Sequence, residues 1–145
     1  MSTPTTTPGI PIPVPDERSA GYWAAAADGV LALSCCDHCG YLAMPPDIIC
    51  VGCRSTEPSF HDQPVSGNGT VRSWTVMRVA FLPGFAPLVP YTLADVELDE
   101  QANLRIVARV LAGEEVLAVG ARAHTEFEEI APGFNVPGFV IEETS

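Results

Sequence analysis

The sequence contains no lysine: its seven cationic side chains are all arginine, against eighteen acidic residues, and the formal net charge is -11. Nucleic-acid binders usually carry a basic surface, because neutralisation of phosphates drives their affinity. This chain would repel a polyanion on average. The composition therefore argues against nucleic acid as the main partner.

Long apolar runs are also absent. No run approaches the ~18 residues of a membrane span, although 47% of the residues are hydrophobic and the mean hydropathy is +0.21. The first fifteen residues lack the basic and apolar regions of a secretory signal. We therefore expect a soluble, cytoplasmic, globular protein with no membrane partner.

Familiar catalytic motifs are missing as well. There is no Walker loop, no GxGxxG after a strand, no GxSxG elbow and no HExxH. Glu114–Glu115 and Glu128–Glu129 fit solvated turns and strand ends better than paired catalytic carboxylates. His61 and His124 show no spacing with carboxylates that indicates a dyad, and His38 is expected to be an exposed turn residue. No catalytic residue is predicted, and the sequence favours a binding or scaffolding subunit over an enzyme.

Cysteine, in contrast, is plentiful. Four of the five cysteines form two knuckles, Cys36-x2-Cys39 and Cys50-x2-Cys53. In a reducing compartment, clustered cysteines are more often metal ligands than disulfides, and an odd count agrees with this interpretation. Four thiolates give tetrahedral sulfur coordination, which suits Zn²⁺ or iron. Because four ligands leave no position for water, the predicted metal is structural.

Three neighbouring residues refine this prediction. Gly40 follows the second ligand of the first knuckle, where a positive φ angle is commonly needed, and Gly52 is given a similar role in the second. Cys35 would make an x3 knuckle, so it is interpreted as a free cysteine on a ribbon strand.

The N-terminal part divides into a tail and a helix. Residues 1–15 hold five prolines, which favours an extended, solvated tail that would lie over a partner as an arm if it binds anything. Residues 16–29 predict a helix with Asp16 as N-cap and Asp28-Gly29 as its end. Tyr22 and Trp23 are its only bulky apolar side chains. They would dock the helix on a neighbouring module or a partner subunit, and core packing is favoured for Trp23.

The rest of the chain is predicted to be mainly β. Residues 30–60 fit two short strands that carry the cysteine turns, which is how a ribbon is built. Residues 61–145 contain five alternating segments that predict a small closed barrel, at 69–79, 91–98, 104–111, 121–129 and 138–143.

The loop "AFLPGFAPLVP" breaks the rule that loops are polar. Its bulky residues, Phe81 and Phe85 among them, are interrupted by three prolines. Such a loop is costly to expose. It either folds back over the mouth of the barrel or forms a surface for a partner or ligand.

This order of parts resembles the acyl-CoA-associated family of rubredoxin-like zinc ribbon plus OB-fold proteins, catalogued as domain-of-unknown-function family thirty-five. The resemblance covers about residues 16–142. It rests on "GYWAAAADGVLALSCCDHCGYLAMPP", "CVGC", "SGNGTVRSWTVMR", "PGFAPLVPYTLADVELDE" and "LAVGARA".

The resemblance implies an N-terminal helix, a rubredoxin-like zinc ribbon and a five-stranded OB-fold barrel. It also implies a companion subunit of thiolase-superfamily enzymes, such as lipid-transfer-type thiolases and the retro-aldolases that shorten sterol side chains. The partner would supply the catalytic residues. The loop would sit at the entrance of the partner's active site, stabilise it and help form the acyl-CoA channel. Two such chains on a dimeric partner would make a heterotetramer.

The resemblance also assigns residues. The structural Zn²⁺ would be held by Cys36, Cys39, Cys50 and Cys53. The partner and acyl-CoA loop would comprise Phe81, Pro83, Gly84, Phe85, Pro90 and Tyr91. Independently of the resemblance, the helix is expected to face a partner with Tyr22 and Trp23. Two positions depart from the family pattern: Val51 replaces a common proline, and Cys35 replaces a basic residue beside the ribbon.

Two other functions remain open from the sequence. OB barrels and zinc ribbons occur in single-stranded nucleic-acid binders, in which Trp74 and Phe127 would stack on bases. Iron at the four thiolates would instead make a rubredoxin-like electron carrier.

Overall fold

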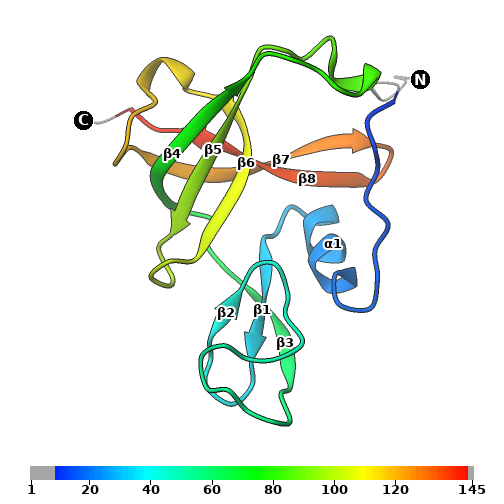
Figure 1. Cartoon of the computed structure of the whole chain (residues 1–145), viewed down its shortest axis with the longest axis vertical. Coiled ribbons are helices and arrows are strands. Elements are labelled where there is room, and N and C mark those ends of the chain that lie inside the picture. The colour runs from blue at the N-terminus through cyan, green and yellow to red at the C-terminus, as the bar shows by residue number, and fades with distance from the viewer. Residues whose placement is uncertain (1–8, 144–145) are drawn as a thin grey trace.

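The computed structural model describes residues 9–143, which fold into a small three-stranded sheet, a five-stranded barrel and one helix between them (Figure 1). No helix in this part of the chain is long and apolar enough to cross a membrane. The elements are α1 (Ala20–Ala27), β1 (Ala32–Cys36), β2 (Leu42–Ala43), β3 (Phe60–Pro64), β4 (Gly69–Met77), η1 (Pro83–Phe85), β5 (Tyr91–Leu98), β6 (Arg105–Ala112), η2 (Glu114–Val116), β7 (Arg122–Ala131) and β8 (Phe134–Ile141).

The three-stranded sheet carries both cysteine knuckles. Its strand order is β2-β1-β3, and both pairings are antiparallel. Two strands were predicted here. The third, β3, pairs with β1 over its whole length, from Ala32 opposite Pro64 to Cys36 opposite Phe60. The predicted domain boundary between residues 60 and 61 therefore falls inside a strand of the ribbon sheet.

The barrel has the strand order β4-β5-β6-β8-β7, with β6 and β8 parallel and the other pairs antiparallel. Strand β5 alternates strictly between half-buried and buried residues, as a strand with one face on the core must. The core includes Val71, Val96 and Phe139, all fully buried. The predicted fold class is confirmed: mainly β, with one N-terminal helix, a ribbon and a closed five-stranded sheet.

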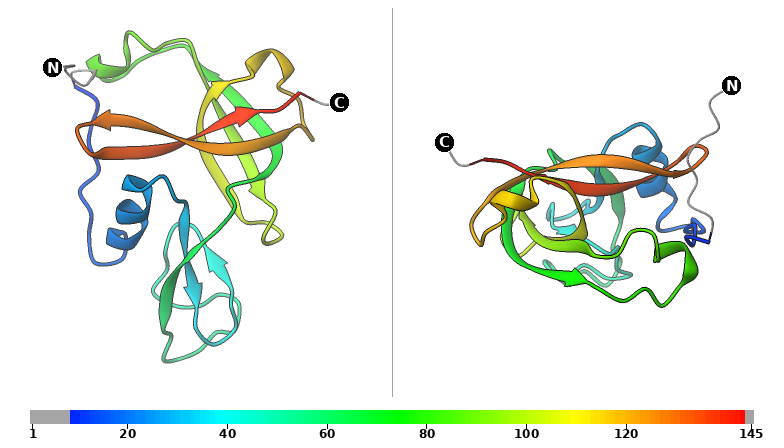
Figure 2. Two further views of the ribbon diagram at one scale, coloured as in Figure 1. Left: turned by 180° about the vertical axis from the view of Figure 1, so that it is seen from behind. Right: turned by 90° about the horizontal axis from the view of Figure 1, so that it is seen from above.

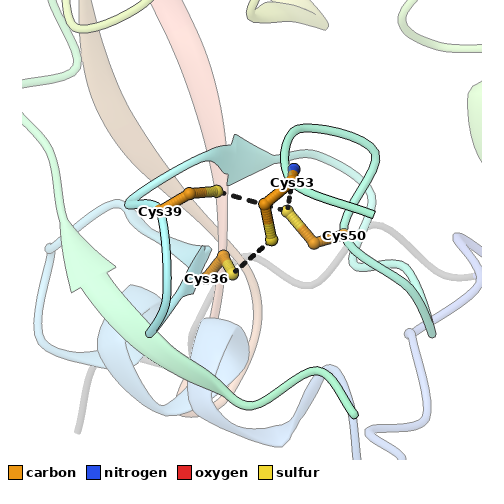
Figure 3. A group of neighbouring side chains, drawn as sticks. All are labelled: Cys36, Cys39, Cys50 and Cys53. Carbon is orange, nitrogen blue, oxygen red and sulfur yellow. Dashed lines mark hydrogen bonds between the residues drawn. The ribbon is translucent and has the colours of Figure 1, made fainter. Parts of the chain in front are cut away.

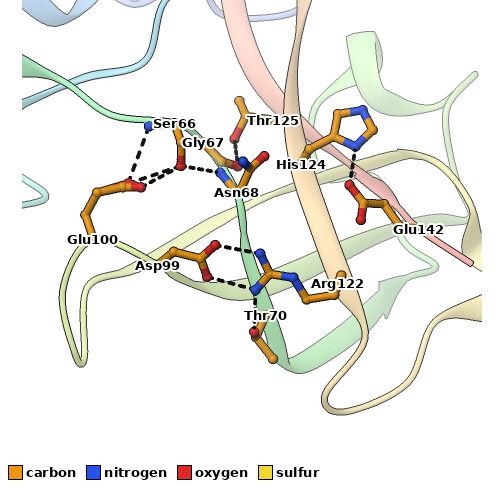
Figure 4. A network of polar contacts seen from close by, with 10 residues as sticks. All are labelled: Ser66, Gly67, Asn68, Thr70, Asp99, Glu100, Arg122, His124, Thr125 and Glu142. Carbon is orange, nitrogen blue, oxygen red and sulfur yellow. Dashed lines mark hydrogen bonds and ion pairs between the residues drawn. The ribbon is translucent and has the colours of Figure 1, made fainter. Parts of the chain in front are cut away.

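The barrel is closed tightly at only one end. Strands β4 and β7 pair at just two positions, Gly69 opposite Ala123 and Thr70 opposite Arg122. A polar network holds this end together: Arg122 donates to Thr70 Oγ1 at 3.1 Å and to Asp99 Oδ1 at 2.8 Å (Figure 4). Beyond these residues the β4–β5 and β7–β8 hairpins diverge, as Figure 2 shows.

Helix α1 joins the two sheets. It packs against β1 and β8. Tyr22 is buried, and Trp23 lies edge-on to it and also against Phe134 of β8, with ring centroids 4.7 and 5.1 Å apart. The Asn135 amide donates to the Ala26 carbonyl at 3.1 Å. This is the core packing that the sequence favours for Trp23. Because Tyr22 is covered by the chain itself, only Trp23 of the two offers area to a partner.

A side-chain amide fixes the ribbon to the barrel. Gln101, in the turn between β5 and β6, accepts from the Leu42 backbone N–H at 2.9 Å and donates to the Leu42 carbonyl at 2.8 Å. The Gln101 side chain therefore hydrogen-bonds to Leu42 of β2 as the backbone of a neighbouring strand would. The metal-site sheet consequently has a defined position on the barrel.

Two predicted elements, the helix and the last strand, start four residues away from their positions in the structure. Helix α1 begins after Ser19, because the Asp16 carboxylate accepts from the backbone N–H groups of Arg18 and Ser19 and caps an earlier turn instead. Strand β8 begins at Phe134, four residues before the predicted start at 138. Pro137 argued against a strand here, because proline is rare inside sheets. The strand tolerates it because β8 pairs with β6 only from Gly138 onward, so one edge of β8 is free at Pro137.

Candidate metal centre and apolar loop

The four knuckle cysteines converge at one point (Figure 3). Their sulfur atoms all lie within 4.8 Å of one another; Cys36 Sγ is 3.9 Å from Cys53 Sγ, and Cys39 Sγ is 3.5 Å from Cys50 Sγ. These separations exceed the ~2.0 Å of a disulfide bond. They are close to the ~3.8 Å expected between sulfurs that surround one zinc ion tetrahedrally at ~2.3 Å. The cluster therefore has the donor set and spacing of a structural metal site.

The two knuckles share one backbone design. In the first, the Gly40 N–H donates to the Cys36 carbonyl at 2.8 Å, and in the second the Arg54 N–H donates to the Cys50 carbonyl at 2.9 Å. Both donors have positive φ, 76° for Gly40 and 56° for Arg54. The prediction that Gly52 adopts this conformation is wrong. A glycine is needed there because a Cβ atom would lie 2.9 Å from Cβ of Tyr41.

Four thiols this close do not ionise together without a cation. The Cys53 backbone N–H, which lies 3.5 Å from Cys50 Sγ, lowers the pKa of Cys50 to about 7. The backbone N–H of Tyr41 favours the Cys39 thiolate, but desolvation and the neighbouring sulfurs outweigh it and raise the pKa of Cys39 to about 12. Repulsion between neighbouring thiolates keeps protons on some of these sulfurs. A divalent cation would neutralise the thiolates and displace those protons.

The conformation of Gly40 yields a testable prediction. Gly40→Ala is expected to reduce metal affinity about fivefold, because a Cβ atom in the left-handed region costs about 1 kcal/mol. Nothing else lies within 4 Å of the added methyl group, so backbone strain alone acts. Gly133→Ala is the matched control, since Gly133 has a φ of 73° and equally open space but lies in the β7–β8 turn. Competition with a colorimetric chelator measures both; equal losses of metal affinity would contradict the assignment.

The other polar side chains of the ribbon lie around this centre. Cys35 is buried on β1 and outside the sulfur cluster, as predicted for a free cysteine. Nε2 of His38 lies 3.2 Å from the Glu57 carbonyl at the surface. His61 is paired with a carboxylate after all, because its Nδ1 lies 2.5 Å from Asp37 Oδ1. The pairing of β1 with β3 creates this contact across 24 residues, so no local spacing signals it.

The apolar loop between β4 and β5 faces two ways. Phe81 and Leu82 are 88% and 45% exposed. Phe85 instead is half-buried beside Tyr91, with ring centroids 6.1 Å apart, and Gly84 is buried. Pro83 and Pro90 lie at the surface. The two halves of the loop therefore differ: Gly84 and Phe85 fold back onto the chain, whereas Phe81 and Leu82 are exposed. That the exposed half forms a surface for a partner or ligand stays a prediction.

The exposed half of the loop forms part of a shallow pocket. Val79, Phe81 and Leu82 line one shallow pocket of about 180 Å³ together with Phe85 and Tyr91. Trp74 and Val76 of β4 are exposed as well. We call these exposed side chains the β4–loop surface: Trp74, Val76, Val79, Phe81 and Leu82.

A second exposed apolar set was missed by the sequence analysis. Ile48, Ile49 and Val51, in and beside the second knuckle, are each more than half exposed. Only Val51 drew notice in the sequence, as a departure from the family pattern. The signal was present in "DIICVGC", where three aliphatic residues surround a metal ligand in a turn that is too short to bury them.

Comparisons with known proteins agree with this architecture. Residues 62–128 match the family described as ChsH2, C-terminal OB-fold domain, and residues 23–59 match the family described as ChsH2, rubredoxin-like zinc ribbon domain. A search of curated proteins found no match. The chain is also similar to a chain of the solved structure entitled "Ltp2-ChsH2(DUF35) aldolase", with 26% identity, a TM-score of 0.73, and coverage of 89% of this chain and 98% of that chain. With its ribbon, its barrel and the order in which they follow, this chain belongs to the ChsH2 family of zinc ribbon plus OB-fold proteins.

Proposed function

We propose that this chain is the non-catalytic accessory subunit of a complex with a thiolase-superfamily enzyme that acts on acyl-CoA. The observation that carries the proposal is the exposed β4–loop surface on a chain similar to one in a structure entitled as an Ltp2-ChsH2 aldolase. That title names two proteins for one aldolase. A lipid-transfer-type thiolase or a retro-aldolase is therefore the expected partner.

The chemistry of the β4–loop surface suits a protein interface. It combines Trp74 and Phe81 with aliphatic neighbours, and aromatic side chains are enriched at the centres of interfaces. Pro83 at the start of η1, and Pro87 and Pro90 after it, stiffen the loop, which lowers the entropy lost when it is ordered against a partner. We propose that this surface stabilises the partner and forms one wall of its acyl-CoA channel.

The proposed metal is Zn²⁺ in a structural role. Cys36, Cys39, Cys50 and Cys53 would complete its coordination and leave no position for a reacting water molecule. Bound there, zinc supplies cross-linking rather than catalysis, because a ribbon of this size buries little apolar surface. The ribbon would thereby hold Ile48, Ile49 and Val51 in fixed positions at its tip.

The substrate proposal rests on analogy. Steroid side-chain CoA thioesters are our preferred class, because the resemblance includes enzymes that shorten sterol side chains. The acyl pocket would lie mainly in the partner. A partner dimer would carry two copies of this chain, and we place the heterotetramer in the cytoplasm.

The charge distribution disfavours the nucleic-acid alternative. Four of the seven arginines form ion pairs with acidic side chains, namely Arg72, Arg105, Arg109 and Arg122. These cations are therefore already neutralised and offer little to a phosphate backbone. A filter-binding assay at low salt should retain no single-stranded DNA or RNA at micromolar protein, and retention would favour this alternative. A colourless protein with stoichiometric zinc would likewise exclude the iron-based electron carrier.

The test is reconstitution with a thiolase-like partner. We expect each chain alone to show no turnover of an acyl-CoA substrate, and the mixed proteins to show turnover and co-elute at the mass of a heterotetramer in light scattering. Turnover by this chain alone, or no co-elution with any thiolase-superfamily candidate from the same cells, would contradict the proposal.

A further inference from the structure

The open end of the barrel creates a mouth that strand pairing does not fill. The β4–β5 hairpin continues to Met77 opposite Tyr91, and the β7–β8 hairpin continues to Ala131 opposite Phe134, but β4 and β7 no longer pair there. The apolar loop and the N-terminal arm, residues 9–15, lie across this gap (Figures 1 and 2). The arm therefore lies against the loop and the β7–β8 hairpin without pairing with either as a strand.

A cavity of about 360 Å³ lies under the arm. Its walls are mostly apolar: Phe85 and Leu88 come from the loop, Leu93 from β5, and Ile130 and Val136 from the β7–β8 hairpin. The ion pair between Arg109 and Glu128 is the charged part of the wall. Ile10, Pro11 and Pro13 of the arm form the remaining side. The mouth thus already accommodates an extended apolar segment.

The arm is held by shape and apolar contact alone. Its backbone passes so close to Gly84 that a Cβ atom on that residue would lie 2.4 Å from the Gly9 carbonyl carbon and the Ile10 nitrogen. Within the described residues, no hydrogen bond joins residues 9–15 to the rest of the chain. Its prolines have no N–H to donate. Release of the arm therefore breaks no hydrogen bond.

The two sides of the arm differ. Ile10 and Pro13 line the cavity and are half-buried, whereas Ile12 and Val14 are 48% and 89% exposed. An extended, proline-containing segment presents its residues in this way when one side rests in a groove. Ile10 therefore lies on the inner side of the arm and Ile12 on its outer side, so the same side chain is present once on each side.

From these observations we propose that the barrel mouth is a binding groove for an extended, proline-containing apolar segment, and that the chain's own residues 9–13 occupy it reversibly as a strap. The strap rests on the same loop that the proposed function assigns to the partner. Docking of the partner would then release the strap, which makes the groove accessible only in the complex. This last step rests on the proposed function; the groove and its strap do not.

The test is a titration of the full chain with a fluorescein-labelled peptide of sequence GIPIPVP, which reproduces residues 9–15. The tethered arm has an effective concentration on the order of millimolar, so it should suppress binding of the free peptide. Ile10→Asp places a charge on the inner side and should eject the strap. The Ile10→Asp chain is expected to bind the peptide at least fivefold more tightly than the unchanged chain, and Ile12→Asp, the matched outer control, is expected to leave binding unchanged.

Two further measurements test whether the peptide binds specifically in the groove. Adding Gly84→Ala to the Ile10→Asp chain should abolish peptide binding, because the methyl group fills the space that the peptide backbone needs. A peptide carrying Ile10→Asp should not bind either. If the Ile10→Asp chain binds no peptide, or if Ile12→Asp and Ile10→Asp act alike, the proposal is overturned. No partner is used, so such a failure would leave the proposed function standing.

Discussion

Cys39→Ser is expected to remove the metal from the protein and to unfold the ribbon. Structural zinc binding supplies about 10 kcal/mol or more of folding free energy in small metal-dependent domains, and a serine oxygen is a poor replacement for a thiolate ligand. Residues 30–60 should lose protection from hydrogen exchange, while the barrel retains its own core around Val96 and Phe139. The zinc content measured by elemental analysis should fall from one zinc per chain to near zero.

The neighbouring cysteine supplies the control. Cys35 is 7% exposed and lies outside the sulfur cluster, so Cys35→Ser changes the same atom one residue before the first ligand. It should lower stability by about 1–2 kcal/mol through burial of a hydroxyl, with one zinc per chain retained. Full zinc content in the Cys39→Ser protein would refute the metal-site assignment.

Phe81→Ala is expected to weaken the complex with the thiolase-like partner by about 2 kcal/mol or more, which is roughly thirtyfold in Kd. Phe81 is 88% exposed in the free chain, so its ring is available to fill a pocket on the partner. For the same reason the substitution should change the stability of the free chain by less than about 0.5 kcal/mol. Isothermal titration and thermal unfolding measure the two effects separately.

Phe85→Ala provides the contrast within the same loop. Phe85 is half-buried and lines the cavity under the arm, so its truncation should lower the stability of the free chain by about 1–2 kcal/mol. If Phe81→Ala destabilises the free chain as much as Phe85→Ala and leaves the Kd unchanged, the β4–loop surface is not the interface.

Local sequence was sufficient for the metal site because both knuckles are local. Two x2 spacings place pairs of sulfurs on tight turns, and the short strands between them bring the pairs together. The backbone detail was less predictable, because Arg54 adopts the positive φ that sequence assigns to glycine. An arginine gives no sign of this conformation, and only the hydrogen bond from its N–H to Cys50 explains it.

Contacts that depend on strand register were not predictable. The Asp37–His61 pair, the Gln101–Leu42 link and the passage of Gly9 over Gly84 each join residues that are far apart in the chain. Alternation predicts that a segment is a strand but gives no register between distant strands. The proline content of residues 1–15 favours an extended, solvated tail. The described residues 9–15 contain no helix or strand, but Ile10 and Pro13 are half-buried, and nothing in the composition indicates that burial.

The most direct test of the accessory role is recovery of the partner. The tagged chain should be purified from an extract of its native cells, treated with nuclease, and its co-purifying proteins quantified by mass spectrometry. The proposed function predicts a thiolase-superfamily protein in near-equal molar amount, lost when the tagged chain carries Phe81→Ala. Recovery of the chain alone, or only with ribosomal or replication proteins that nuclease removes, would contradict it.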